Sequence, residues 1–219
     1  MRSAGSWCRR PAAVLGNVKP VIAVDGVAPG VGKSTLRRQI VALLTDRGIT
    51  STAFAEEDVL THPAFSPVAA EFETTGKVGP GTLLQAAADY LRWFEEDPRD
   101  VAVTDALFPF VASLLGWGHD EPEIDEFLGK LHAVAGAPAI LFVYLDDDPR
   151  AAITRAVARE RDGWLEWLIG TLNDASGEPV IDLDSLSAYL YRRRDMTCRL
   201  LARHGWRVVR LEDMTAVSP

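Results

Sequence analysis

The chain carries at residues 21–35 the stretch Val21-Ile-Ala-Val-Asp-Gly-Val-Ala-Pro-Gly-Val-Gly-Lys-Ser-Thr35, an apolar run that ends in a glycine-rich turn. A helical pattern follows at once, with apolar residues at positions 36, 40, 43 and 44. A strand, a glycine-rich loop and a helix in this order form the context of a phosphate-binding loop. The glycines let backbone N–H groups approach phosphate oxygens, and the helix start adds unpaired donors and a positive dipole end. The stretch therefore predicts a site for a nucleoside triphosphate.

Individual roles follow from this loop. Lys33 is expected to reach the outer phosphates, and the hydroxyl of Ser34 to bind Mg²⁺. The motif places its first glycine at position 27, where this chain has Val27, and Gly26 lies one residue early. The alternative, a glycine-rich turn that merely begins a helix, leaves the run Lys-Ser-Thr unexplained. The predicted nucleotide-binding residues are Pro29, Gly30, Val31, Gly32, Lys33, Ser34 and Thr35.

Composition restricts the class of protein to which the chain can belong. The chain has 219 residues, of which 47% are hydrophobic, so one α/β domain can bury a large core. A net charge of −8 argues against binding a nucleic acid polymer. The two cysteines favour reduced thiols in a cytoplasmic protein, and no apolar run reaches membrane-spanning length. We expect residues 1–17 to form a flexible extension and residues 18–219 a single domain.

Short apolar segments alternate with helical patterns along the chain. Because most of these segments are apolar throughout, they are typical of strands buried on both faces of a parallel sheet. The alternation predicts a doubly wound α/β fold with five strands, whose functional residues lie at the carboxyl ends of the strands. The predicted strands are Val21–Asp25, Thr50–Ala55, Val101–Asp105, Ala139–Leu145 and Trp206–Leu211. The predicted helices are Ser34–Arg47, Gly81–Glu96, Leu107–Leu115, Glu121–Ala135, Pro149–Arg161 and Leu183–His204.

Acidic residues stand where the second and third strands end. The second is followed by Glu56, Glu57 and Asp58, and the third closes on Asp105. A hydroxyl that accepts a phosphoryl group needs an oriented carboxylate, and Mg²⁺ needs carboxylates or the waters that they hold. The alternatives are a solvated acidic loop and helix caps. The pattern leaves open whether Glu56, Glu57 or Asp105 is the base, and Asp105 is also a candidate metal ligand.

Two further segments carry candidate binding residues. After the third strand, Phe108 is a candidate contact for an organic acceptor, although core packing explains most of this aromatic segment. On the predicted helix after the fourth strand, Arg155 and Arg159 share one face and suit a phosphate chain. A mobile lid is expected at about residues 150–180. A solvated helix is the alternative, because all but four of the 23 basic residues are arginine, and Arg192–Arg194 most simply form a surface patch.

Together these pieces resemble the P-loop nucleoside and nucleotide kinases, the group of deoxynucleoside and thymidylate kinases. The resemblance spans roughly residues 20–212, and only the loop is highly specific. It implies a three-layer P-loop NTPase fold with a five-stranded parallel sheet, a carboxylate after strand two, an acid after strand three and an arginine-bearing lid. It also implies ATP and Mg²⁺ as cofactors, and it places Gln85 on the helix from which deoxynucleoside kinases read the base.

The departures from these kinases concern the acceptor. Their strand-three acid is followed by arginine, whereas Asp105 is followed by Ala106, and the strand-two acid lacks the usual proline. We therefore expect a kinase that phosphorylates a hydroxyl of a nucleoside, a nucleoside-like antibiotic or a related metabolite. A nucleoside monophosphate kinase is one alternative, and a P-loop ATPase or switch acting through a partner is another. A homodimer is a possible assembly.

Overall fold

The computed structural model describes residues 19–212 apart from 60, 107, 137–138 and 177–178. Its centre is a five-stranded sheet in the order β2-β3-β1-β4-β5, and every neighbouring pair is parallel. The strands are β1 (Val21–Gly26), β2 (Ser51–Phe54), β3 (Val101–Thr104), β4 (Ile140–Asp146) and β5 (Arg207–Glu212). The chain thus leaves β1 for the edge of the sheet, returns beside β1 as β3 and then crosses to β4. This topology confirms the predicted three-layer fold with five parallel strands.

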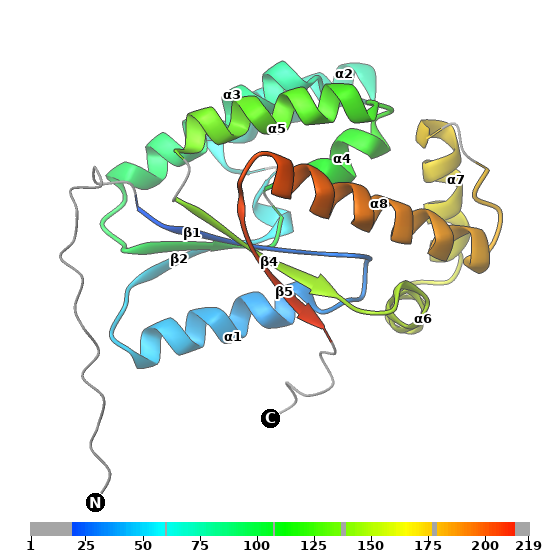
Figure 1. The fold of residues 1–219 in the computed structure, drawn as a ribbon, viewed down its shortest axis with the longest axis horizontal. Coiled ribbons are helices and arrows are strands. Elements are labelled where there is room, and N and C mark those ends of the chain that lie inside the picture. Colours follow the sequence, from blue (N-terminus) through cyan, green and yellow to red (C-terminus); the bar gives the residue numbers. More distant parts are fainter. Residues whose placement is uncertain (1–18, 60, 107, 137–138, 177–178, 213–219) are drawn as a thin grey trace, which may run out of the picture.

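Helices cover both faces of the sheet (Figure 1). Helix α1 (Lys33–Asp46) lies on one face. Helices α2 (Ser66–Thr75), α3 (Pro80–Glu96), α4 (Val111–Gly116) and α5 (Glu121–Ala135) lie on the other. Helices α6 (Pro149–Arg159), α7 (Trp164–Ser176) and α8 (Leu183–Arg203) follow β4, and two short 3₁₀ turns, η1 (Glu56–Asp58) and η2 (Pro63–Phe65), follow β2.

The hydrophobic core divides into two clusters because the sheet is buried on both faces. Alternate residues of β1 show the division, since Ala23 packs in the cluster with α3 and α5, while Val24 packs in the cluster with α1 and α6. Helix α8 joins the clusters, since Leu190 belongs to one and Leu200 to the other. The carboxyl ends of β1 and β3 therefore open between well-packed layers, at the point where the strand order reverses and ligands usually bind.

The structure differs from the predicted helices in three places. A separate helix, α7, occupies residues 164–176, and the helix predicted to end at Arg161 ends at Arg159. Helix α2 was not predicted, because its one buried residue, Val68, gives no apolar stripe. The helix predicted from residue 107 begins only at Val111, after a cis peptide before Pro109. Phe108 and Phe110 there have φ angles of 43° and 63°, which a right-handed helix does not contain.

The predicted extension, residues 1–17, lies outside the described residues. Within residues 19–212, the helices are all too short or too polar to span a bilayer.

Candidate active site

The phosphate-binding loop lies between β1 and α1, and its glycines are required by the local backbone. Gly30 and Gly32 have φ angles of 80° and 104°, which side chains with a Cβ rarely adopt. A Cβ on Gly30 would also lie 2.2 Å from the carbonyl oxygen of Ala152 in α6. The loop therefore packs directly against α6, and α1 begins at Lys33 with its N-terminal donors at the loop.

The position where the motif has its first glycine is filled by a buried valine with its own hydrogen bonds. Val27 has no exposed surface, and its N–H donates to the carbonyl of Leu145 over 3.1 Å. Its carbonyl accepts a hydrogen bond of 2.6 Å from the guanidinium of Arg193 in α8. The start of the phosphate-binding loop is thus held by β4 on one side and by α8 on the other.

Two adjoining cavities open at this end of the sheet. The first, called here the loop cavity, is lined by the phosphate-binding loop, Arg38 and the side chains of α6 and α7 that face it. The second, the strand-end cavity, lies beyond β1 and β3 and has an apolar wall made by residues 108–112. Pro29, Lys33 and Glu56 line both cavities, so the two adjoin at these residues.

Asp105 lies in the strand-end cavity, and a cation from α1 accompanies it. Its carboxylate is buried, and Oδ1 is 3.1 Å from Nε of Arg37, although the two are not aligned as a hydrogen bond. Arg37 lies one helical turn after Lys33, so α1 presents both cations to this end of the sheet. The charge of Asp105 is therefore balanced by a residue that is distant in the sequence.

The acidic run after β2 divides into residues with different surroundings. Glu56 lines both cavities and is exposed to them. Asp58 closes the 3₁₀ turn, since its Oδ2 accepts the N–H of Ala55 over 2.7 Å. The side chain of Glu57 lies outside the described part of the chain. Among the described side chains of this acidic run, Glu56 is thus the one that lies at the site.

The structure adds two residues that the sequence reasoning missed. Asp25, the penultimate residue of β1, lines the strand-end cavity. Burial raises the pKa of its carboxyl group, and the nearby charges of Lys33 and Arg193 oppose that rise. Arg193 lines the same cavity. The sequence spacing could have placed Arg193 on the inner face of its helix, because it follows the buried Leu190 by three residues and precedes the buried Thr197 by four.

The two arginines of α6 have different positions. Arg155 contacts the loop from outside, since its Nε donates to the carbonyl of Gly30 over 3.3 Å and its Nη2 pairs with Asp147 at 2.5 Å. Arg159 lines the loop cavity and pairs with Glu160 at 2.7 Å. The predicted role of both in binding phosphates stays a prediction, and Arg159 is the one whose position opens on the cavity.

Phe108 and Gln85, the two side chains predicted to contact the acceptor, lie in different places. Phe108 is buried in the wall of the strand-end cavity, where its ring meets that of Phe110 edge to face, with centroids 5.4 Å apart. Gln85 is exposed on α3, its amide donates to Asp89 over 3.1 Å, and it lines neither of the two cavities. The structure therefore does not bring Gln85 to the site.

The donor set of the site fits a hard cation such as Mg²⁺ bound together with phosphates. Ser34 presents a hydroxyl in the loop cavity, and Asp105 presents a carboxylate in the cavity that adjoins it. Among the described residues, no three Cys, His, Asp or Glu side chains cluster as a preformed metal site. Such a sparse set suits a cation that keeps waters and shares substrate phosphates as ligands.

The strand order, the loop after β1 and the flanking helices together make the fold that of the P-loop kinases. Among solved structures, the chain is similar to the thymidylate kinase from Ehrlichia chaffeensis. The TM-score is 0.52 at 14% identity, over 90% of this chain and 93% of that one. A thymidylate kinase from Candida albicans matches 89% of this chain and 84% of its own, with a TM-score of 0.49 and 14% identity. No family model and no curated protein matches the sequence.

Proposed function

We propose that the protein is an ATP-dependent kinase that transfers the γ-phosphoryl group to a hydroxyl of a nucleoside or a nucleoside-like metabolite, antibiotics of that type included. The observation that carries this proposal is that the two cavities adjoin at Lys33 and Glu56, which line both. The loop cavity offers backbone donors and a lysine for phosphates, and the strand-end cavity offers carboxylates opposite an apolar wall. A phosphoryl donor and an organic acceptor can thus meet at one lysine.

The residues supply positioning and charge for the transfer. The acceptor hydroxyl gives its proton to a carboxylate, its oxygen forms a bond to the γ-phosphorus, and the bond from that phosphorus to the oxygen of ADP breaks. Glu56 and Asp105 are the described candidates for the base, and Glu57 stays a candidate from the sequence. Lys33 stabilises charge on the transferring group, aided by Arg159. Ser34 and Asp105 would hold Mg²⁺, which supplies further charge neutralisation to the phosphates.

The charges of the strand-end cavity favour an uncharged acceptor. Asp25, Glu56 and Asp105 line it together with two cations, Lys33 and Arg193. Lys33 is needed for the donor, and Arg193 already donates to the carbonyl of Val27. The dianion of a monophosphate would face three carboxylates, an arrangement that opposes its binding. The alternative, a nucleoside monophosphate kinase, is favoured by the thymidylate kinase structures among the neighbours.

A P-loop ATPase or switch protein that acts through a partner is the alternative from another class. The sequence lacks the Asn-Lys-x-Asp motif of guanine-specific switches, and Thr171-Leu-Asn-Asp174 does not supply it. A partner-driven ATPase would release phosphate by attack of water, whether or not a hydroxylated compound is present. The cytoplasmic location and the homodimer stay predictions.

A screen for ADP release separates these functions. We expect slow background hydrolysis of ATP that a nucleoside or nucleoside-like antibiotic accelerates, with the phosphorylated compound detected by mass spectrometry. The matching 5′-monophosphates should accelerate ADP release far less, because the described residues of the strand-end cavity offer no cation beyond Lys33 and Arg193. Preferential phosphorylation of monophosphates would establish the alternative kinase, and hydrolysis that no acceptor changes would contradict a kinase.

Replacement of Arg193 tests how the phosphate-binding loop is held in place. We expect Arg193→Met to weaken binding of MgADP by roughly tenfold, because the buried carbonyl of Val27 loses its donor, a loss of about 1–3 kcal/mol. Arg193→Lys should recover part of the affinity. Isothermal titration calorimetry measures both, and Arg192→Met, the exposed neighbour, serves as the control. Equal affinities for wild type and Arg193→Met would show that the loop does not depend on this bond.

A further inference from the structure

Helix α7 presents an apolar face to the loop cavity. Trp164, Trp167 and Leu168 line this cavity opposite the glycines of the phosphate-binding loop. Their spacing of three and four residues places them on one face of the helix. The same cavity is lined by the polar and charged residues Ser34, Arg38 and Arg159, so the indoles form its apolar side.

Packing explains two of these three side chains and leaves Trp167. Trp164 and Leu168 are partly buried against the core cluster that contains α6 and α8. Trp167 is 56% exposed and is not part of that cluster. Within the described residues, no aromatic ring or guanidinium stacks on its indole. A large aromatic surface is thus left open inside a cavity built for phosphates.

We infer that Trp167 is the surface on which the heteroaromatic base of the nucleotide donor stacks, an inference that rests on the proposed kinase function. The ligand whose phosphates bind Gly30, Gly32 and Ser34 enters the cavity that Trp167 lines. Its flat base has a π-face that an exposed indole can cover, and such stacking tolerates any base. The cavity has a volume of about 620 Å³, which is within the usual range of small-molecule sites, so a nucleotide fits.

The acceptor has a separate apolar surface, which assigns Trp167 to the donor. The strand-end cavity is walled by Phe108 and Phe110, and Trp167 is not among its lining residues. A ring carried by the acceptor therefore meets those phenylalanines. The indole of Trp167 is therefore available to the ligand that occupies the loop cavity, which is the nucleotide.

Comparison of ADP with inorganic tripolyphosphate tests the inference, because tripolyphosphate has the phosphates and lacks the base. In the full chain with Mg²⁺, Trp167→Ala should bind ADP roughly tenfold more weakly, by the energy of one stacked base. It should bind tripolyphosphate as wild type does. Trp167→Phe should keep most of the affinity for ADP, since a ring remains. Calorimetry measures all of these affinities, and circular dichroism checks folding.

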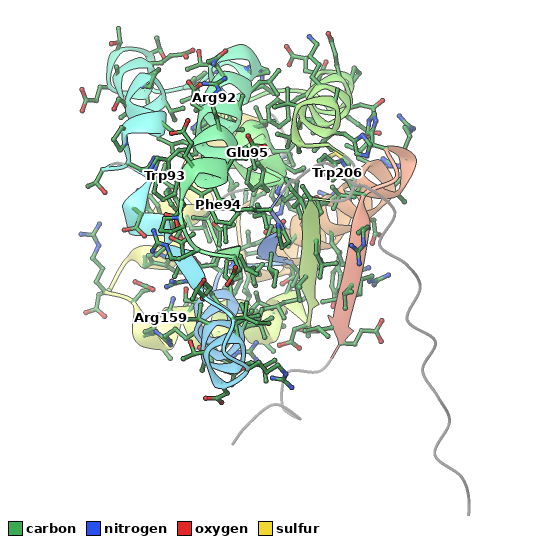
Figure 2. The ribbon with its side chains drawn as sticks, turned by 90° about the vertical axis from the view of Figure 1, so that its left-hand side faces the viewer. Arg92, Trp93, Phe94, Glu95, Arg159 and Trp206 are labelled. Carbon is green, nitrogen blue, oxygen red and sulfur yellow. The ribbon has the colours of Figure 1, made fainter. Side chains whose placement is uncertain are left out.

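Tryptophan fluorescence gives a second measurement with a matched control. ADP should quench the emission of wild type and of Trp93→Phe. The quenching should be markedly weaker in Trp167→Phe, where Trp164 is the tryptophan left among the described lining residues of the loop cavity. Trp93 is the control position, because it is a second exposed tryptophan: it is 39% exposed on α3 and contacts the ring of His62. Figure 2 shows Trp93 well apart from Arg159, which lines the loop cavity.

The outcomes distinguish this inference from the proposed function. Unchanged affinity of Trp167→Ala for ADP would overturn the inference and leave the kinase proposal standing. An equal loss for ADP and tripolyphosphate would also overturn it, because the indole would then support the loop. A wild type that binds neither ligand would overturn the proposed function itself.

Discussion

Lys33→Ala is expected to lower the rate of phosphoryl transfer by roughly 10³-fold or more, while the protein stays folded. Lys33 is the cation that both cavities share, so in the proposed mechanism it would face the transferring group whichever acceptor is bound. Its loss removes charge stabilisation where negative charge develops, and no other lysine among the residues lining these cavities can replace it. Initial rates of ADP release with a saturating acceptor measure the effect.

Lys77→Ala is the matched control, because Lys77 is exposed after α2 and lies in neither cavity. It should leave the rate within twofold of wild type, roughly the scatter of surface substitutions. Circular dichroism and thermal unfolding should show both variants folded. A folded Lys33→Ala protein with wild-type activity would contradict the mechanism, whichever compound serves as acceptor.

Asp105→Asn is expected to produce a loss of activity and a loss of stability together. Phosphoryl transfer should fall by about 10²-fold or more, because a carboxylate at the reacting end of the cavity is neutralised. The free energy of unfolding should fall by about 3 kcal/mol, because Arg37 keeps a largely buried charge without its partner. Urea denaturation measures the second effect, and ADP release measures the first.

A double variant separates the two effects of Asp105. In Arg37→Met/Asp105→Leu, no unpaired charge remains, so stability should return toward that of wild type. Activity should stay low, because the carboxylate is still absent. If the double variant recovers activity along with stability, Asp105 acts only by supporting the fold. If Asp105→Asn changes neither quantity, the pair with Arg37 has no role in stability or in catalysis.

The sheet and the phosphate-binding loop could be predicted because their signals are local. Each strand is a continuous apolar run, as strands buried on both faces must be, and parallel strands bring their carboxyl ends to one edge. That geometry alone places the loop and Asp105 together, and it brings Glu56 to the same edge. Local signals failed where backbone conformation overrode the pattern, as at Phe108 and Phe110, whose left-handed φ angles delay the start of α4.

The residues that complete the site come from elements whose placement depends on tertiary packing. Arg193 belongs to a run of three arginines. Helical spacing places it on the buried face of α8, and tertiary packing decides that this face meets the loop. No partner for Asp105 could be predicted, because Arg37 comes from α1, far away in the sequence. Gln85 lines neither cavity, since a residue type on a helix does not indicate which side of that helix faces the site.

The two cavities adjoin at Lys33 and Glu56, and this has a consequence for inhibitor design. One molecule that joins an adenine nucleotide to an acceptor through a short phosphate chain would occupy both cavities at once. Tethering turns the second contact into an intramolecular event, so the affinity of the joined molecule can exceed either half by roughly 10²–10⁴-fold. Linkers of graded length would then act as a molecular ruler, and the tightest-binding one would report the span between donor and acceptor during transfer.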